Sequence, residues 1–438
     1  MTTVAVQPPA RSALAQPGRR LALAGILALA AFLHFFRLEQ EGFGNLYYAA
    51  AVESMRQSWH NFFFVSFDPG GFVSVDKPPL GLWAQVWSAQ LFGFTGWSLH
   101  LPQALAGVLS VGLLYGLVRR VFGPTAGLLA ALVLTLTPIS VAANRNNTMD
   151  SLLVLTSLWA AGAASLAAER GQLRWLLVCA LLVGAGFNIK MLQAMLIAPA
   201  VFGVYLLTAP IGRLKRLAHL ALAGGLLAVV SLAWPLAVEA TPPDARPYIG
   251  SSQNNSVLEL IIGHNGLARL GSMASLLGRP AGPGRPGPAN PPPAGPGRRP
   301  PAGSPLPSPP AGAPPQAGPG LQNETGPAGP LRLFNPQLAG QASWFLPLAV
   351  ACAATLAWQA GRRLDQRHRA ALLWALWLIP QIVFFSYAGL FHRYYLEMLS
   401  PAIAALTGAG LAGLWRDYQA GGPRGWLLPA LLAGTLAV

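Results

Sequence analysis

Long apolar runs, repeated along most of the chain, constrain its fold more than any other feature. A run of about 18 or more apolar residues is typical of a transmembrane helix. Charged residues make up only 10% of the 438 residues, whereas a soluble domain has about 25%. The sequence therefore predicts an all-α polytopic membrane protein with about eleven transmembrane helices. The predicted spans are residues 21–38, 98–118, 122–141, 151–168, 173–188, 191–208, 217–238, 343–360, 370–388, 395–415 and 426–438.

The loops between these spans differ in charge from one side of the membrane to the other. If the N-terminus is cytoplasmic, most Lys and Arg of the short loops lie on the cytoplasmic side, as the positive-inside rule requires. Most of the 14 acidic residues then lie on the outer side. We therefore expect a cytoplasmic N-terminus and polar chemistry on the outer face.

The net charge of +15 is also typical of proteins that bind nucleic acid. Here the cytoplasmic loops and a basic Pro/Gly tract account for much of the excess, so we expect no nucleic-acid partner. The only two cysteines, Cys179 and Cys352, lie inside predicted spans. Neither a disulfide nor a thiolate metal site is therefore expected.

The distribution of polar, apolar and Pro/Gly-rich segments divides the chain into five parts. Because the last apolar run reaches residue 438, we expect further sequence beyond it. The Pro/Gly-rich part cannot bury a core and is expected to be disordered. The predicted parts are a cytoplasmic tail (1–20), an N-terminal transmembrane region (21–238) with an outer loop (39–97), an ordered outer loop (239–277), the Pro/Gly-rich segment (278–330) and a C-terminal transmembrane region (331–438).

The first outer loop begins with a pattern that predicts an amphipathic helix lying in the membrane interface. Aromatic side chains in such a helix lie at headgroup depth. A structural anchor and a functional element explain this pattern equally well. One face carries Tyr48, Val52, Met55 and Trp59, and another carries Glu53, Arg56, Gln57 and His60.

Two short segments follow in the same loop, Asp68-Pro69-Gly70-Gly71 and Asp76-Lys77-Pro78-Pro79. Glycine allows the backbone to approach a ligand closely, and proline fixes the direction of the chain. Asp76 and Lys77 place a hydrogen-bond acceptor and a cation at one point near the bilayer. Neighbouring residues seldom pair with each other, so we expect both groups to face a ligand.

Two later polar clusters also lie at predicted outer ends of spans. The first runs from Asn144 to Asp150; Arg145 with Asn146 and Asn147 suits phosphate or sugar hydroxyls, while the position of Asp150 is also explained by the helix dipole. The second runs from Phe391 to Glu397. An aromatic belt explains its tyrosines but not its His-Arg pair.

Four strings in this order resemble glycosyltransferase family 39, whose members have the GT-C fold. They are NLYYAAAV (45–52), SWHNFFF (58–64), DPGGFVSVDKPP (68–79) and RPYIGSSQNNSVLELIIGHNG (246–266). The resemblance is strongest to the bacterial subgroup described as YkcB-like or mannosyltransferase-like. It extends to protein O-mannosyltransferases and to the aminoarabinose transferases that modify lipid A.

The resemblance implies inverting transfer of a hexose or pentose from a polyprenyl-phosphate donor to a glycolipid, glycan or protein acceptor. It places the protein in the bacterial plasma (inner) membrane, with the active site on the outer face. Such a reaction needs a carboxylate base and cations for the leaving lipid phosphate. The candidate phosphate- and substrate-binding residues are Lys77, Arg145, Asn45, Tyr48, Arg246 and Arg393. By resemblance, Asp76 with His264 and His392 would bind a divalent metal ion.

One position departs from the family pattern. Many members carry an Asp-Glu pair, which supplies the proposed base, where this chain has Gly44-Asn45. The candidate catalytic carboxylates are Asp76, Asp150 and Glu53, with Glu41 and Asp68 as further substitutes. We favour Asp76 and Asp150 because they lie in matching motifs.

A transporter or flippase for lipid-linked sugars is the alternative function. A transporter is expected to place ionisable groups near the middle of the bilayer, whereas the acidic residues here gather at one face. A non-catalytic scaffold leaves the Asp76-Lys77-Pro78-Pro79 segment unexplained. The sequence favours glycosyl transfer and specifies neither the sugar nor the acceptor.

Overall fold

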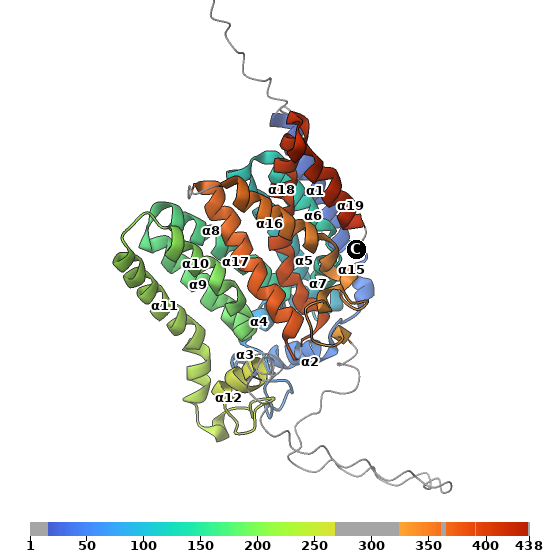
Figure 1. The fold of residues 1–438 in the computed structure, drawn as a ribbon. Helices are drawn as coiled ribbons and strands as arrows, with labels where there is room; N and C mark the ends of the chain where they lie inside the picture. The colour runs from blue at the N-terminus through green and yellow to red at the C-terminus, as the bar shows by residue number, and fades with distance from the viewer. Residues whose placement is uncertain (1–15, 268–323, 361–364, 390, 437–438) are drawn as a thin grey trace, which may run out of the picture.

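The computed structural model describes residues 16–267, 324–360, 365–389 and 391–436, and in this part of the chain the protein is a helical bundle (Figure 1). The predicted all-α class is confirmed. The described residues form helices, and their only β-structure is two isolated bridges, Ser66 with Ser74 and Val73 with Tyr248. The longer helices are α1 (Gln16–Phe35), α4 (Pro79–Phe92), α5 (Gly96–Phe122), α6 (Pro124–Leu136), α8 (Asp150–Arg170), α9 (Leu173–Lys190), α10 (Ala198–Thr208), α11 (Arg213–Glu239), α16 (Leu346–Ala360), α17 (Gln366–Tyr387), α18 (Ser400–Ala420) and α19 (Leu427–Leu436). The shorter ones are α2 (Leu46–Met55), α3 (Trp59–Phe64), α7 (Pro138–Asn144), α12 (Val257–Ile262), α15 (Ala339–Ala342), the 3-10 helices η1 (Leu38–Glu41), η2 (Met191–Ile197), η3 (Pro243–Ala245), η5 (Arg332–Phe334), η6 (Ser343–Phe345), η7 (Arg393–Leu399) and η8 (Pro423–Trp426), and the π-helical turn η4 (Gly263–Leu267).

Among the described residues, eight helical stretches are long and apolar enough to cross a membrane, or nine if a bent pair counts as one span. The predicted number of about eleven is therefore not confirmed. The bent pair is α6 with α7, which meet at 63° where Pro138 interrupts the predicted span 122–141. The described part of the predicted span 426–438 holds only the ten-residue helix α19.

The remaining difference lies in one stretch of 36 residues, Leu173–Thr208, which contains two predicted spans. A single crossing needs about 20 residues, so this stretch is too long for one. The chain reverses after Lys190, where Met191 has a positive φ of 41°. Gly171 consequently lies against Ile211. The two helical halves of this stretch, α9 and α10, both pack against α8.

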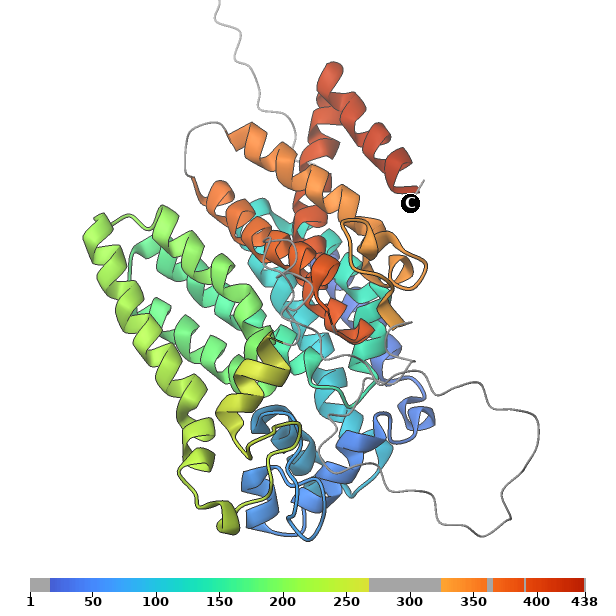
Figure 2. The same cartoon turned by 60° about the horizontal axis from the view of Figure 1, so that its bottom comes forward.

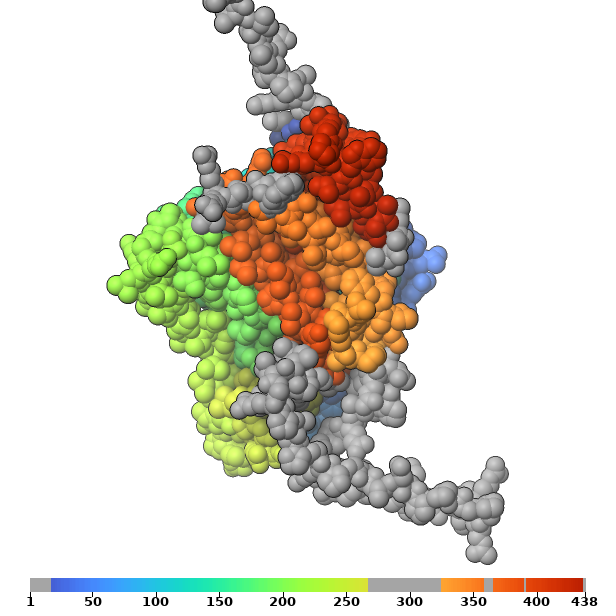
Figure 3. Space-filling view, viewed as in Figure 1, coloured from blue at the N-terminus to red at the C-terminus, as the bar shows by residue number. Residues whose placement is uncertain are grey.

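The sides of the bundle are apolar, as a lipid-facing surface requires. Helix α11 forms one edge of the face shown in Figure 3. Its Leu214, Leu222 and Val229 side chains are all more than half exposed. In the interior, α8 packs against α9 and α18 packs against α6. Small residues allow the second contact, since a Cβ on Gly408 would stand 2.6 Å from the Ala126 carbonyl oxygen.

One end of the bundle carries the short helices α2, α3 and α12 together with α4 (Figure 2). We call it the site end. The prediction of a single amphipathic helix here is wrong. Helix α2 ends at Met55, and a second helix, α3, begins after its N-cap residue Ser58. Tyr48 and Met55 are buried in the core, whereas Trp59 is 75% exposed on α3.

Residues 324–335 pack at the ends of α17 and η7. The first seven of them, 324–330, were expected to be disordered. The rest of the Pro/Gly-rich segment, within 268–323, lies outside the described residues. Glu324 contacts His392 at 3.2 Å, and the Gly329 backbone donates to the Ser386 carbonyl at 2.9 Å. The buried Arg332 side chain donates to the Ala388 carbonyl at 2.6 Å. We call residues 324–335 the strap.

Candidate active site

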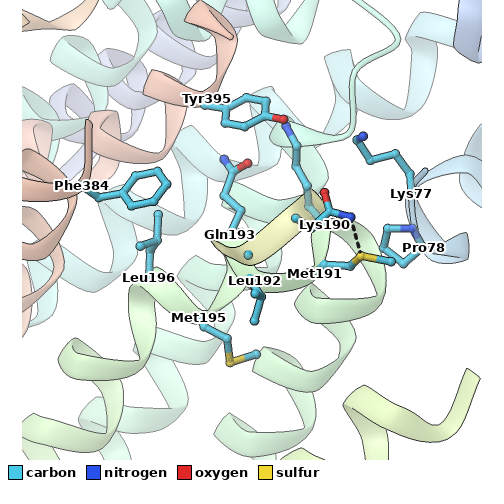
Figure 4. A pocket seen from close by; sticks show the side chains of 12 residues that line it. Lys77, Pro78, Lys190, Met191, Leu192, Gln193, Met195, Leu196, Phe384 and Tyr395 are labelled. Carbon is cyan, nitrogen blue, oxygen red and sulfur yellow. Dashed lines mark hydrogen bonds between the residues drawn. The ribbon is translucent and has the colours of Figure 1, made fainter. Parts of the chain in front are cut away.

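A pocket of about 250 Å³ lies at the site end, where segments from five parts of the chain meet. Two lysines, a tyrosine, a glutamine and an asparagine supply its polar groups, and leucine, methionine and phenylalanine supply its apolar wall (Figure 4). The lining residues are Lys77, Pro78, Lys190, Met191, Leu192, Gln193, Met195, Leu196, Asn265, Gly266, Phe384 and Tyr395.

Asp76 and Lys77 stand at one side of this pocket, immediately before α4. Pro78 is the N-cap residue of α4 and Pro79 its first residue, a position where proline costs no hydrogen bond. The expectation that neighbouring residues do not pair is wrong here, because the Lys77 ammonium contacts the Asp76 carboxylate. Their side chains are 7% and 14% exposed.

Three further contacts fix Asp76. The Tyr47 hydroxyl accepts a hydrogen bond from its backbone N–H at 3.4 Å, and the Asn265 side chain donates to its carbonyl at 3.3 Å. His264 Nε2 lies 3.4 Å from its carboxylate. Burial alone would raise the pKa of Asp76, but Lys77 and His264 outweigh it and hold that pKa well below its usual range. Asp76 is therefore a carboxylate at neutral pH.

A second ion pair lies at the pocket between α8 and the turn after α9. Lys190 Nζ donates to both carboxylate oxygens of Asp150 at 2.6 Å, and Gln193 donates to the same carboxylate at 3.2 Å. The side chains of Lys190 and Asp150 are 4% and 0% exposed. Asp150 is also the first residue of α8, where the helix dipole favours a negative charge.

Two aromatic rings complete the surroundings of Lys190. Its Nζ lies 3.7 Å from the ring centroid of Tyr395 and 4.7 Å from that of Tyr394, which are cation–π distances. Figure 4 shows the amines of Lys77 and Lys190 on the same side of the pocket as the Tyr395 hydroxyl. The pocket therefore presents two cations above an apolar wall.

Sequence reasoning identified Asp76, Lys77 and Asp150 as site residues but missed Lys190 and Gln193. Lys190 ends an apolar run and belongs to none of the motifs above. A lysine at such a position can be a functional group or an interfacial anchor. Its burial decides between the two, and burial is a tertiary property.

Arg145 does not line the pocket, although we predicted it to bind phosphate. Its guanidinium donates to the carbonyls of Leu33 and Phe36 at 3.1 and 2.9 Å, and it pairs with Glu41 at 2.7 Å. These carbonyls lie at the C-terminal end of α1, which leaves such acceptors without helical partners. Arg145 therefore caps α1 and holds η1 beside it.

The other predicted cations and one carboxylate also have partners outside the pocket. Arg246 donates to the carbonyls of Thr241 and Asn255 at 3.0 and 2.9 Å, within its own loop. Arg393 lies 3.7 Å from Glu324 of the strap. Glu53 pairs with Arg56 at 2.5 Å, near the far end of α2.

Asn45 and Tyr48 shape the helix next to the pocket. The Asn45 side chain accepts from the backbone of Tyr47 at 3.0 Å and of Tyr48 at 3.3 Å, and so caps α2. Burial, with Tyr394 and Asp76 nearby, raises the pKa of the Tyr48 hydroxyl well above its usual value. Tyr48 therefore stays neutral, packed between α2 and the site.

Gly44 and Asn45 stand where many family members carry an Asp-Glu pair. There is no room for a side chain at residue 44. Gly44 has a φ of +62°, and a Cβ there would stand 2.6 Å from His100 Nε2 and 2.9 Å from the Asn147 side-chain oxygen. Asn147 accepts from the Asn45 backbone at 2.7 Å and donates back at 3.0 Å. This pairing fixes the start of α2 in place.

The three predicted metal ligands are not brought together. His264 contacts Asp76, but His392 pairs with Glu324 at 3.2 Å and stacks on Tyr394. Among the described residues, no three His, Cys, Asp or Glu side chains are grouped as a metal site requires. The residues present do not fit the predicted metal.

Comparison with known proteins shows the family of this chain. The family described as dolichyl-phosphate-mannose-protein mannosyltransferase matches residues 76–234, which include both ion pairs. YycA and YkcB of Bacillus subtilis (strain 168), both named as mannosyltransferases by inference, are 42% and 41% identical over 94% of this chain. The chain spans 67% and 64% of their lengths.

Solved structures share the fold at lower identity. ArnT from Cupriavidus metallidurans aligns with a TM-score of 0.59 and 21% identity, over 96% of this chain and 63% of ArnT. The oligosaccharyltransferase of Archaeoglobus fulgidus aligns with a TM-score of 0.56 and 15% identity, over 96% of this chain and 54% of that enzyme. The chain has the GT-C fold of a multi-pass membrane protein and belongs to glycosyltransferase family 39.

Proposed function

We propose that this protein transfers a hexose or pentose from a polyprenyl-phosphate donor to a hydroxyl of a glycolipid, glycan or protein, with inversion at the anomeric carbon. The observation that carries the proposal is the pair of buried ammonium groups, Lys77 and Lys190, lining one small apolar pocket. A lipid phosphate needs cations for its headgroup and an apolar surface for its chain. The related fold of ArnT has been solved with undecaprenyl phosphate bound.

In the proposed reaction, the acceptor oxygen attacks the anomeric carbon while the bond from that carbon to the phosphate oxygen breaks. The leaving phosphate takes the bonding electrons and an added negative charge, which Lys77 and Lys190 stabilise. Since cations perform this task, no acid needs to protonate the leaving group. The acceptor proton passes to a carboxylate.

Asp76 is the carboxylate that best fits the role of base. Asp150 is fully buried and held through both oxygens by Lys190, and Glu53 pairs with Arg56. Asp76 keeps a partly exposed side chain beside the pocket. When Lys77 moves to the donor phosphate, the Asp76 carboxylate is released to accept the acceptor proton. The base is thereby freed only when a donor is bound.

The proposed setting is the bacterial plasma membrane, with the N-terminus in the cytoplasm and the site end outside. The charge distribution of the loops supports this orientation. A flippase for lipid-linked sugars remains the second candidate, because Asp150 and Lys190 are ionisable groups buried within a helical bundle.

The test is transfer of radiolabelled sugar from polyprenyl-phosphate sugars in proteoliposomes that contain the full-length protein. We expect label to reach an acceptor with the wild type, to be lost with Asp76→Asn, and to need far higher donor concentrations with Lys77→Ala. Lys215→Ala, on the exposed start of α11, is the matched lysine control. Donor that crosses the bilayer without transfer would establish the flippase instead.

A further inference from the structure

Behind the pocket, η7 is joined to the start of α8 at two places. On the pocket side, the Tyr395 ring contacts the Lys190 ammonium, which in turn pairs with Asp150. On the far side, Glu397 accepts a hydrogen bond from the Ser151 hydroxyl at 3.3 Å. Consecutive residues of α8 therefore hold two residues of the same short helix, η7.

Glu397 is 2% exposed and lines a second, very small cavity. This cavity measures about 10 Å³ and lies between α1, α5, α6, α7, α8 and η7. Its polar lining residues besides Glu397 are His34, Ser110, Ser140 and Asn144. Asn144 and His34 contact each other through the Asn144 amide nitrogen and His34 Nε2 at 3.1 Å.

The cavity is polar but its polar atoms are unsatisfied. Three of them find no hydrogen-bond partner among the residues that the structure describes: Asn144 Oδ1, Ser110 Oγ and Ser140 Oγ. Buried polar groups are almost always hydrogen-bonded, to protein or to an ordered water. An internal water needs about 10–15 Å³ and two to four polar partners, and this cavity supplies both.

We propose that one water binds in this cavity and donates to Glu397, and that Glu397 is a positioning residue that keeps Tyr395 beneath Lys190. The water offers two donors, one for the carboxylate and one for a neighbouring oxygen such as Asn144 Oδ1. With Ser151 donating to it and this water hydrogen-bonded to it, the buried carboxyl group of Glu397 is satisfied. The functional part of the inference rests on the proposed donor-binding role of the pocket.

The geometry explains why a residue outside the pocket would affect it. Tyr395 and Glu397 are two residues apart on a 3-10 helix of seven residues, so a shift of one displaces the other. Without the Glu397 contact, η7 loses its side-chain hydrogen bond to α8 on the far side and keeps its backbone packing and the contact at the pocket side. The Tyr395 ring can then leave Lys190, and the cation that meets the donor phosphate loses its cation–π contact while Asp150 still holds it.

The experiment compares three variants by two measurements. Glu397→Ala removes the carboxylate, Glu397→Gln keeps an acceptor for Ser151, and Ser140→Thr adds a methyl group to a cavity that has room for one water. Thr407→Val is the control, since Thr407 is a fully buried hydroxyl without a partner among the described residues, on α18 and outside the cavity lining. The measurements are cryo-EM maps that resolve ordered waters and the affinity for undecaprenyl phosphate.

We expect density for one water in the wild type and in Glu397→Gln, and none in Ser140→Thr. In Glu397→Ala, the Tyr395 ring should leave Lys190 and undecaprenyl phosphate should bind about tenfold more weakly, the size of one hydrogen bond to a charged group. Glu397→Gln should restore both. An empty cavity in the wild type, or an unmoved Tyr395 in Glu397→Ala, would overturn the inference.

The two measurements separate this inference from the proposed function. If the wild type shows the water and Glu397→Ala displaces Tyr395, but undecaprenyl phosphate does not bind, the proposed function fails and the positioning role of Glu397 stands. If Thr407→Val weakens binding as much as Glu397→Ala, the effect is general destabilisation and the inference fails.

Discussion

Lys190 and Asp150 form a buried ion pair across 40 positions of sequence, with 2.6 Å from the lysine nitrogen to each carboxylate oxygen. The packing of α9 against α8 brings Lys190, the last residue of α9, to the first residue of α8. This pair joins the structural core to the pocket, because Lys190 also lines the pocket beside Tyr395. Stability and donor binding should therefore respond differently to substitutions within the pair.

Asp150→Asn should destabilise the protein by about 3–5 kcal/mol, because it leaves the Lys190 charge buried without a partner. The double variant Asp150→Asn/Lys190→Met should recover most of that loss, since neither charge remains. Thermal unfolding in detergent measures the stability and undecaprenyl-phosphate binding measures the site. If the double variant recovered binding as well as stability, the role of Lys190 in the pocket would be disproved.

Arg145→Ala should lower stability without changing donor affinity. The substitution removes the ion pair with Glu41 and the hydrogen bonds to the end of α1, a loss of about 1.5–3 kcal/mol for bonds from a charged donor. A rise in the donor KM at unchanged stability would instead support the phosphate-binding role predicted from the sequence.

His264→Ala and His392→Ala should differ in their effects on transfer. His264 contacts Asp76, so its loss should alter the proposed base and reduce kcat. His392 contacts the strap through Glu324, so its loss should leave kcat nearly unchanged. The outcome that would contradict this has two parts. Both variants would lose kcat equally, and chelation would abolish wild-type activity until a divalent metal is added back. Both histidines would then bind a metal, as the family resemblance implied.

Restoring an acidic residue at position 44 should fail, whereas position 45 should accept one. Gly44→Asp requires a left-handed backbone and a clash with His100, which together should cost at least about 1–3 kcal/mol. Asn45→Asp keeps a good N-cap for α2 and should unfold at nearly the wild-type temperature. Equal stability of the two variants would contradict the geometry around Gly44.

The strap should loosen as the pH falls. The hydrogen bond from His392, with Arg393 nearby, holds the pKa of Glu324 below its usual 4.5. A carboxyl whose folded pKa is lowered stabilises the fold above its unfolded pKa and loses that contribution as the pH falls through the folded value. Hydrogen-exchange protection of residues 324–335 should therefore fall on acidification below pH 4.5.

Glu324→Gln is the control for that prediction. Its side chain does not titrate, so protection of the strap should be weaker at neutral pH and should not change further on acidification. A wild-type strap that stays equally protected at both pH values would show that Glu324 does not hold it.

Much of the fold could be predicted from the sequence, because apolar runs of membrane-spanning length need no tertiary information. The differences arose at breaks within those runs. Pro138 bends one predicted span, and the reversal at Met191 depends on a positive φ that the side chain does not specify. The break between α2 and α3 was missed although serine is a favoured N-cap residue, because the helical spacing of Tyr48, Val52, Met55 and Trp59 continues across it.

The site could be predicted only where its residues are adjacent in the chain. Asp76 and Lys77 form a recognisable motif, but Lys190 joins the pocket only through the packing of α8 against α9. Arg145 was predicted to bind phosphate from its polar neighbours in the chain. Its actual partner, Glu41, is 104 positions away and cannot be inferred from the local sequence. A cation in a polar motif has the same sequence pattern whether it binds a ligand or caps a helix.

The pocket draws its walls from residue 77 at one extreme and residue 395 at the other, which has a consequence for biosynthesis. Chains are made and inserted from the N-terminus, so early helices fold before later ones exist. The two lysines enter the membrane well before Phe384 and Tyr395 arrive to complete the wall. A partly synthesised chain therefore holds the charges without the cavity and should be unable to capture donor lipid until α17 and η7 have packed.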